Sequence, residues 1–232
     1  MRYDADQIRL IKSSGAKTLT FGVESGSDRI LKLICKDITS AEVLAANKRA
    51  KEFGFLVNYH FMIGFPDETR EDIAQTTRLI YTLSEDRNVR IYGPSVYIPY
   101  PGTPLLDRCV ELGLSTPNRL EEWVDYDWRK VSQLPCFSRT HRRYMAETLT
   151  VCTYATLKRD TRQSALRVLA HSVLRHYFRF RLLSLSRGFR LFDLDTGILR
   201  LLKHVLLTLR RWTEQKVGQV SSDGVPSDEL ST

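Results

Sequence analysis

Residues 55–69 read FLVNYHFMIGFPDET, and this stretch decides the fold class. Side chains along its first nine residues alternate between two faces, which is the pattern of a β-strand. Gly64 then allows a tight turn, and Thr69 with Asp72 three residues later forms a capping box that begins a helix. The stretch therefore predicts a strand that passes through a short turn directly into a helix.

The same unit occurs before and after this stretch. A first strand is predicted at Thr18–Glu24, and a short helix follows it at about Asp28–Cys35. A capping box of Thr39 and Glu42 then predicts the start of a second helix, which runs to Phe53. A third strand is predicted at Tyr92–Pro99, and the next helix runs between Pro104 and Gly113. Repeated strand–turn–helix units with short connections predict parallel strands joined by right-handed crossovers. The predicted fold class is therefore α/β.

Distinctive turns follow each predicted strand, at the edge where parallel α/β folds bind ligands. A carboxylate such as Glu24 facing a barrel interior needs a partner, for example a ribose hydroxyl or an ammonium group. Capping of the next helix would explain this residue equally well. The turn at Gly64 either presents backbone N–H groups to a polar ligand or simply connects strand to helix. Three prolines stiffen the third loop, between Pro99 and Pro104.

Three segments taken together resemble one protein family. Gly22–Asp28, Phe61–Thr69 and Tyr100–Leu105, in this order and spacing, are similar to the fourth, fifth and sixth strand ends of radical S-adenosylmethionine (SAM) enzymes. Within this family, they resemble most closely the branch that often carries an amino-terminal cobalamin-binding domain. The resemblance covers about residues 2–113 and implies a partial TIM-like (β/α) barrel with parallel strands.

The resemblance also implies roles for single positions. Glu24 and Ser25 match residues that contact the SAM ribose and its polar neighbours. The strand end at 61–64 matches the segment that lines the adenine pocket, and residues 97–99 match the sixth strand, whose backbone commonly meets the adenine edge. Asn58 and His60 would face the barrel interior and contact the substrate; otherwise they are hydrogen-bonded core residues. Asp67 stands where the family usually has Gly, a departure expected to alter only the turn. The cofactor-binding residues implied are Glu24, Ser25, Phe61, Ile63, Gly64, Tyr97 and Pro99.

The cysteines do not match the family's cluster motif. Radical SAM enzymes hold a [4Fe–4S] cluster with Cys-x-x-x-Cys-x-x-Cys, whereas Cys35, Cys109, Cys136 and Cys152 lie far apart here. We expect Cys35 and Cys109 to be small buried apolar side chains. The cluster ligands would lie upstream of Met1, in a cluster-binding half that would be a partner of this chain. No metal ligand or catalytic residue is therefore assigned.

The rest of the chain is basic and helical in pattern. We expect a connecting extension at 114–142, a basic helical region at 143–216 with helices at 143–160, 163–184 and 196–212, and a disordered tail at 217–232. Residues 138–216 hold 17 Lys and Arg against 5 Asp and Glu. These helices would pack on the barrel with a solvated basic face, or lie on an anionic membrane surface. Nucleic acid is the least expected partner, because no recognition motif is present.

These observations predict a fragment of a radical SAM enzyme that acts on a small-molecule substrate. The parent activity would be reductive cleavage of SAM to a 5′-deoxyadenosyl radical, with methyl transfer or a rearrangement as the outcome if cobalamin takes part. The chain alone is expected to be inactive, because the cluster motif is missing. The alternative is a non-catalytic remnant that serves as a membrane-surface or partner-binding module. Residues 1–20 do not resemble a signal peptide, so a cytoplasmic location is expected, with peripheral membrane association as a variant.

Overall fold

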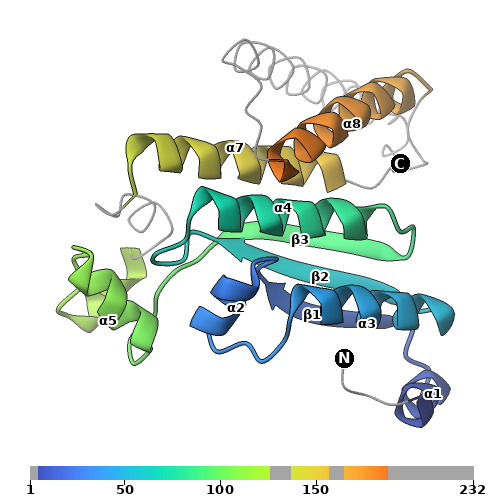
Figure 1. Cartoon of the computed structure of the whole chain (residues 1–232), viewed down its shortest axis with the longest axis horizontal. Helices are drawn as coiled ribbons and strands as arrows, with labels where there is room; N and C mark the ends of the chain where they lie inside the picture. Colours follow the sequence, from blue (N-terminus) through green and yellow to red (C-terminus); the bar gives the residue numbers. More distant parts are fainter. Residues whose placement is uncertain (1–4, 126–136, 157–164, 188–232) are drawn as a thin grey trace, which may run out of the picture. The chain divides into compact units, whose positions relative to one another are not determined.

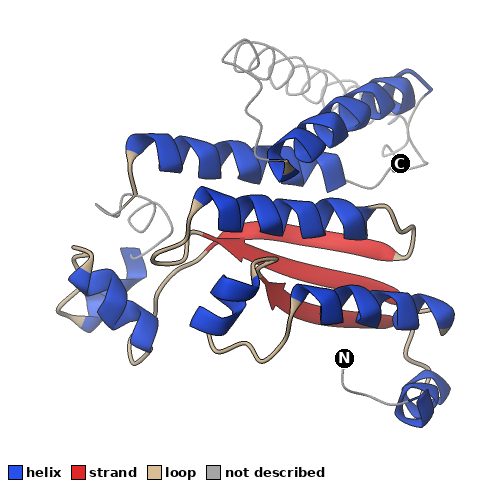
Figure 2. Ribbon diagram, in the orientation of Figure 1, coloured by secondary structure: helices blue, strands red, loops and turns tan. Residues whose placement is uncertain are grey.

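The computed structural model describes residues 5–125, 137–156 and 165–187 (Figure 1). A three-stranded parallel sheet, with the strands in sequence order, forms its centre. The strands are β1 (Thr18–Glu24), β2 (Leu56–Ile63) and β3 (Val89–Val96). The helices are α1 (Ala5–Ser13), α2 (Asp28–Leu33), α3 (Ser40–Glu52), α4 (Arg70–Ser84), α5 (Pro104–Glu111), the 3-10 helix η1 (Leu120–Asp125), α7 (Arg139–Thr156) and α8 (Ala165–Ser186). The predicted α/β fold with parallel strands, consistent with a partial TIM-like barrel, is confirmed (Figure 2).

Capping boxes begin the two helices that lie on the sheet. The Thr39 hydroxyl accepts a hydrogen bond from Glu42 N at 3.2 Å, and the Glu42 carboxylate accepts one from Thr39 N at 2.7 Å. Thr69 and Asp72 repeat this arrangement at the start of α4. Each box satisfies backbone N–H groups that have no partner within the helix. Local sequence therefore fixes where α3 and α4 begin, and α4 begins directly after the turn that follows β2.

The third strand lies three residues earlier than predicted, at Val89–Val96. Pairing with β2 begins early because Val57 N donates to Asn88 O at 2.8 Å. It ends with the bond from Tyr97 N to Ile63 O at 2.8 Å. Further along, Pro99 has no N–H group to continue the ladder.

The two faces of the sheet differ, as the alternation along β2 predicts. Helices α3 and α4 cover one face (Figure 2). Asn58, His60 and Met62 lie on the opposite face, which we call the open face; the His60 side chain is exposed there. The β2 side chains on the helix-covered face are at most 1% exposed: Val57, Tyr59, Phe61 and Ile63.

Helices α7 and α8 pack beside the sheet layer. Helix α7 packs on β3 and α4, and α8 packs on α7 and α4. The Arg78 side chain of α4 donates two hydrogen bonds to Ser186 O, at 3.2 and 2.9 Å. Two of the predicted helices of the basic region are thus present, each shifted by a few residues, and they pack against the α/β part.

Two predicted segments near the carboxyl terminus are not part of the described structure. The helix predicted at 196–212 and the tail at 217–232 lie outside the described residues. Among the helices that are described, none is long and apolar enough to cross a membrane.

Candidate functional site

The ends of the three strands meet at one edge of the sheet. Parallel pairing places Glu24 opposite Phe61 and Ile63 opposite Val96. The bond from Tyr97 N to Ile63 O then joins the loop after β3 to the end of β2. The loops predicted to bind the cofactor therefore begin side by side.

Glu24 lies at this edge with its carboxylate on the open face. Its backbone has φ +69°, an uncommon left-handed conformation for a residue with a side chain. The Glu24 side chain is 23% exposed, and its carboxylate pairs with Lys36, with Oε1 3.1 Å from Nζ. The partner of Glu24 is thus the ammonium group of Lys36, which follows the carboxyl end of α2, whereas Ser27 caps the start of that helix. Lys36 was not identified from the sequence.

Ser25 faces the interior instead of the open face. It is fully buried, and its hydroxyl lies 3.0 Å from Thr76 Oγ1 on α4 and accepts a hydrogen bond from Ser27 N at 3.1 Å. The next residue, Gly26, donates its N–H to the same Thr76 hydroxyl at 3.0 Å. The Ser25 side chain therefore fastens the loop to α4.

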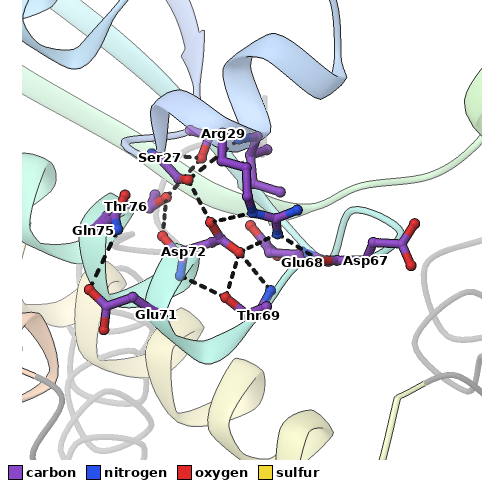
Figure 3. A network of polar contacts seen from close by, with 12 residues as sticks. Ser27, Arg29, Asp67, Glu68, Thr69, Glu71, Asp72, Gln75 and Thr76 are labelled. Atoms are coloured by element: carbon purple, nitrogen blue, oxygen red, sulfur yellow. Dashed lines mark hydrogen bonds and ion pairs between the residues drawn. The ribbon is translucent and has the colours of Figure 1, made fainter.

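A polar network links the loops after β1 and β2 (Figure 3). The Asp72 carboxylate accepts hydrogen bonds from Ser27 Oγ at 2.6 Å, Arg29 Nε at 3.2 Å and Thr69 N at 2.8 Å. Burial by itself would raise the pKa of Asp72, but the bonds from Arg29, Ser27 and Thr69 outweigh it and hold this pKa well below its usual range. The network keeps a buried carboxylate ionised and fixes both loops to the start of α4.

The turn after β2 is built around a second buried acidic side chain, that of Glu68. Gly64 has φ +90° and donates its N–H to Glu68 Oε2. Glu68 is 4% exposed, and burial raises its pKa to about 8. Asp67 has φ +60°, which explains why the resembling family favours Gly there, and its carboxylate pairs with Arg108 Nε of α5 at 2.8 Å. The turn is therefore held on one side by the hydrogen bond between Gly64 and Glu68 and on the other by the ion pair between Asp67 and Arg108.

The remaining predicted cofactor contacts are placed as follows. The Phe61 and Ile63 side chains lie on the helix-covered face, so a ligand on the open face would meet only their backbone atoms. The half-buried Tyr97 ring stacks on Phe65 with ring centroids 4.8 Å apart. Pro99 is buried just beyond this residue.

The open face carries polar and aromatic side chains. His60 stacks on Tyr92 of β3, with ring centroids 4.9 Å apart and planes 9° apart. Asn58 Nδ2 donates to Thr20 Oγ1 at 3.3 Å, and Asn58 Oδ1 is buried without a hydrogen-bond partner in the described part of the chain. The two predicted substrate residues therefore do share one face. Tyr92 was missed, although its place in the strand pattern could have indicated it.

The described residues do not offer a metal site. No group of three or more His, Cys, Asp and Glu side chains within the described ranges could hold a metal ion. Cys109 is buried as expected, but Cys35 is exposed, so that expectation was wrong. Helix α2 ends at Leu33, and Cys35 then adopts φ +53°, which carries its side chain away from the apolar face of the helix.

Comparison with known proteins supports the resemblance. Residues 1–80, which include β1 and β2 with the turns that follow them, match the family model described as the Radical SAM superfamily. The chain is 35% identical over 127 residues to a protein of Pyrococcus horikoshii described as an uncharacterized methyltransferase, covering 54% of this chain and 25% of the relative. It is 33% identical over 121 residues to a tRNA-2-methylthio-N(6)-dimethylallyladenosine synthase of Alkalilimnicola ehrlichii, covering 48% and 25%. It is 38% identical over 100 residues to an uncharacterized protein of Methanocaldococcus jannaschii, covering 42% and 22%.

The matched segment spans about a quarter of the length of these curated relatives. The likeness to radical SAM proteins is thus confirmed, whereas the cobalamin-binding branch is not.

Proposed function

We propose that this chain forms the carboxyl-terminal half of a radical SAM barrel and that the open face of its sheet binds the adenosine part of SAM. One observation carries the proposal: the segment that matches the family model contains the strand ends of Glu24 and Gly64, which lie at one edge of the sheet. Hydrogen bonds to the buried acidic side chains of Asp72 and Glu68 hold the two loops in place.

The residues at this edge fit a nucleoside. The Glu24 carboxylate lies on the open face, where it would accept hydrogen bonds from ribose hydroxyls. The backbone at Ile63, Gly64 and Tyr97 would line the adenine, because the neighbouring side chains are turned away or stacked on each other. A planar base next to rigid backbone needs no further charged group.

The iron–sulfur cluster does not fit the described residues, since these contain no group of metal-ligating side chains. In the proposal its cysteines belong to the cluster-binding half of the barrel. When both are bound, SAM and the cluster supply radical chemistry, while residues of this chain bind and orient the adenosine and help to exclude water.

The relatives favour transfer of a methyl or methylthio group to a substrate as the outcome, because two of them are named as enzymes of these kinds. The same names give no support to the non-catalytic alternative. Participation of cobalamin stays a prediction, as does the cytoplasmic location.

Binding of S-adenosylhomocysteine, a stable analogue of SAM, tests the proposal by isothermal titration calorimetry on the whole chain. We expect measurable binding, weakened about tenfold or more in Glu24→Gln because a charged acceptor is lost. Glu52→Gln is the matched control, since Glu52 lies exposed at the end of α3. Absence of binding at millimolar ligand, or equal binding by both variants, would contradict the proposal.

A further inference from the structure

The Glu24–Lys36 ion pair lies over Gly22 on the open face. Gly22 pairs with His60, and residues paired across parallel strands point to the same side of the sheet. A Cβ atom placed on Gly22 would overlap Glu24 Oε1 and lie 3.5 Å from Lys36 Nζ. The absence of a side chain at position 22 therefore provides the space that the ion pair occupies.

Helix α2 brings Lys36 to this place. At its start, the Ser27 side chain caps the helix and also donates to Asp72. At its end, Cys35 adopts φ +53° and the Lys36 N–H donates to Leu31 O at 2.9 Å. Both ends of this short helix are thus anchored, and the chain is turned so that Lys36 points back toward the strand end from which the helix began.

The ion pair has little to contribute to stability. The Lys36 side chain is 37% exposed and the Glu24 side chain 23% exposed, and ion pairs so accessible to solvent contribute little to stability. The main effect of the ion pair is on the position of the Glu24 carboxylate. Lys36 engages Oε1, whereas Glu24 Oε2 has no hydrogen-bond partner among the described residues. One carboxylate oxygen is therefore held in place while the other stays available to a ligand.

We propose that Lys36 is a positioning residue of the nucleoside site, which holds the Glu24 carboxylate over Gly22 so that its second oxygen accepts a ribose hydroxyl. This inference rests on the proposed function and adds a residue to the same site. A carboxylate without this cation would sample many rotamers, and ordering it on binding costs free energy. Recognition of the ribose hydroxyls would therefore weaken when Lys36 is removed, even though Lys36 itself need not touch the ligand.

Two substitutions remove the arrangement by different routes. Lys36→Met deletes the cation and keeps the length of the side chain. Gly22→Ala leaves Lys36 in place and puts a methyl group where the carboxylate lies; it meets only the ends of two flexible side chains, so the fold should tolerate it. Lys36→Arg is the rescue variant, and Lys32→Met is the matched control, because Lys32 is exposed on α2, four residues before Lys36.

The test compares adenosine with 2′,3′-dideoxyadenosine by calorimetric titration of each variant, with circular dichroism melts to confirm folding. Wild type and Lys32→Met should bind adenosine about tenfold more tightly than the dideoxy nucleoside. This preference should largely disappear in Lys36→Met and Gly22→Ala and return in part in Lys36→Arg.

A folded Lys36→Met that keeps the full preference would overturn the inference and leave the proposed function standing. Failure of the wild-type chain to bind S-adenosylhomocysteine or either nucleoside would overturn both.

Discussion

Arg29 on α2 and Asp72 on α4 form a two-point ion pair that joins the loops after β1 and β2. Arg29 Nε donates to Asp72 Oδ1 at 3.2 Å, and Arg29 Nη2 donates to Oδ2. The same Nη2 also donates to Asp67 O at 2.8 Å, within the turn after β2. Because each loop contains a segment that resembles a family motif, this ion pair sets how the two halves of the proposed site lie relative to each other.

Asp72→Ala should therefore destabilise the chain strongly. It leaves Ser27, Thr69 and Arg29 without their shared acceptor and removes half of the capping box. We expect the free energy of unfolding in urea to fall by about 2–4 kcal/mol. Glu71→Ala, at an exposed position one residue earlier, should change it by about 0.5 kcal/mol or less. Similar losses in both variants would show that the network is not what holds the loops.

Glu68 should make stability depend on pH. Its pKa is raised by burial to about 8 in the folded chain, whereas an unfolded Glu has a pKa of about 4.3. The folded state therefore holds the proton more tightly, and the stabilisation is complete below pH 4 and is lost as pH rises toward 8. Melting temperatures between pH 5 and 8 should fall less steeply in Glu68→Gln than in wild type. Parallel curves would contradict the assignment.

Two glycines near the β1 end should respond differently to an added methyl group. A Cβ atom on Gly26 would lie 2.6 Å from Thr76 Cα and 2.7 Å from Gln75 O, which are backbone atoms of α4. Gly26→Ala should therefore cost about 2–3 kcal/mol in thermal unfolding. Gly22→Ala meets only flexible side chains and should cost less than about 1 kcal/mol. Equal costs would mean that α4 is not packed on the loop as described.

A buried ion pair joins α7 and α8. Arg181 is 1% exposed and pairs with Glu147, which is 16% exposed. Glu147→Ala leaves a buried guanidinium without this partner and should cost about 3 kcal/mol. The control is Glu85→Ala, since Glu85 is 55% exposed in its pair with Arg179 and should contribute less than about 1 kcal/mol. A cost below that of the control would indicate that α8 does not pack on α7 in solution.

An independent prediction concerns the DNA upstream of the Met1 codon. If the chain is half of a radical SAM barrel, this DNA should contain Cys-x-x-x-Cys-x-x-Cys in the same reading frame, because thiolates hold such clusters. Sequencing the gene and its transcript checks this. A stop codon without the triplet would favour the non-catalytic alternative.

Local patterns predicted the framework well. The alternation along β2 separated Asn58 and His60 from the buried face, and the capping boxes located the starts of α3 and α4. These features depend on neighbouring residues only, which is why a sequence can reveal them.

The sequence did not allow contacts between residues far apart in the chain to be predicted. Ser25 lies inward because its hydroxyl forms a hydrogen bond with the hydroxyl of Thr76, 51 residues later, and no local pattern indicates this. Lys36 reaches Glu24 only because the end of α2 turns back. The earlier position of β3 depends on its pairing with β2 and could not be inferred from the β3 residues alone.

Mapping S-adenosylhomocysteine onto the chain tests the central claim most directly. The measurement is a titration of the ¹⁵N-labelled chain followed by amide chemical shifts. We expect the largest changes at Gly22, Glu24, Gly64 and Tyr97, with little change along α7 and α8. Changes confined to α7 and α8, or none at millimolar ligand, would contradict the claim that this edge of the sheet is the adenosine side of a SAM site.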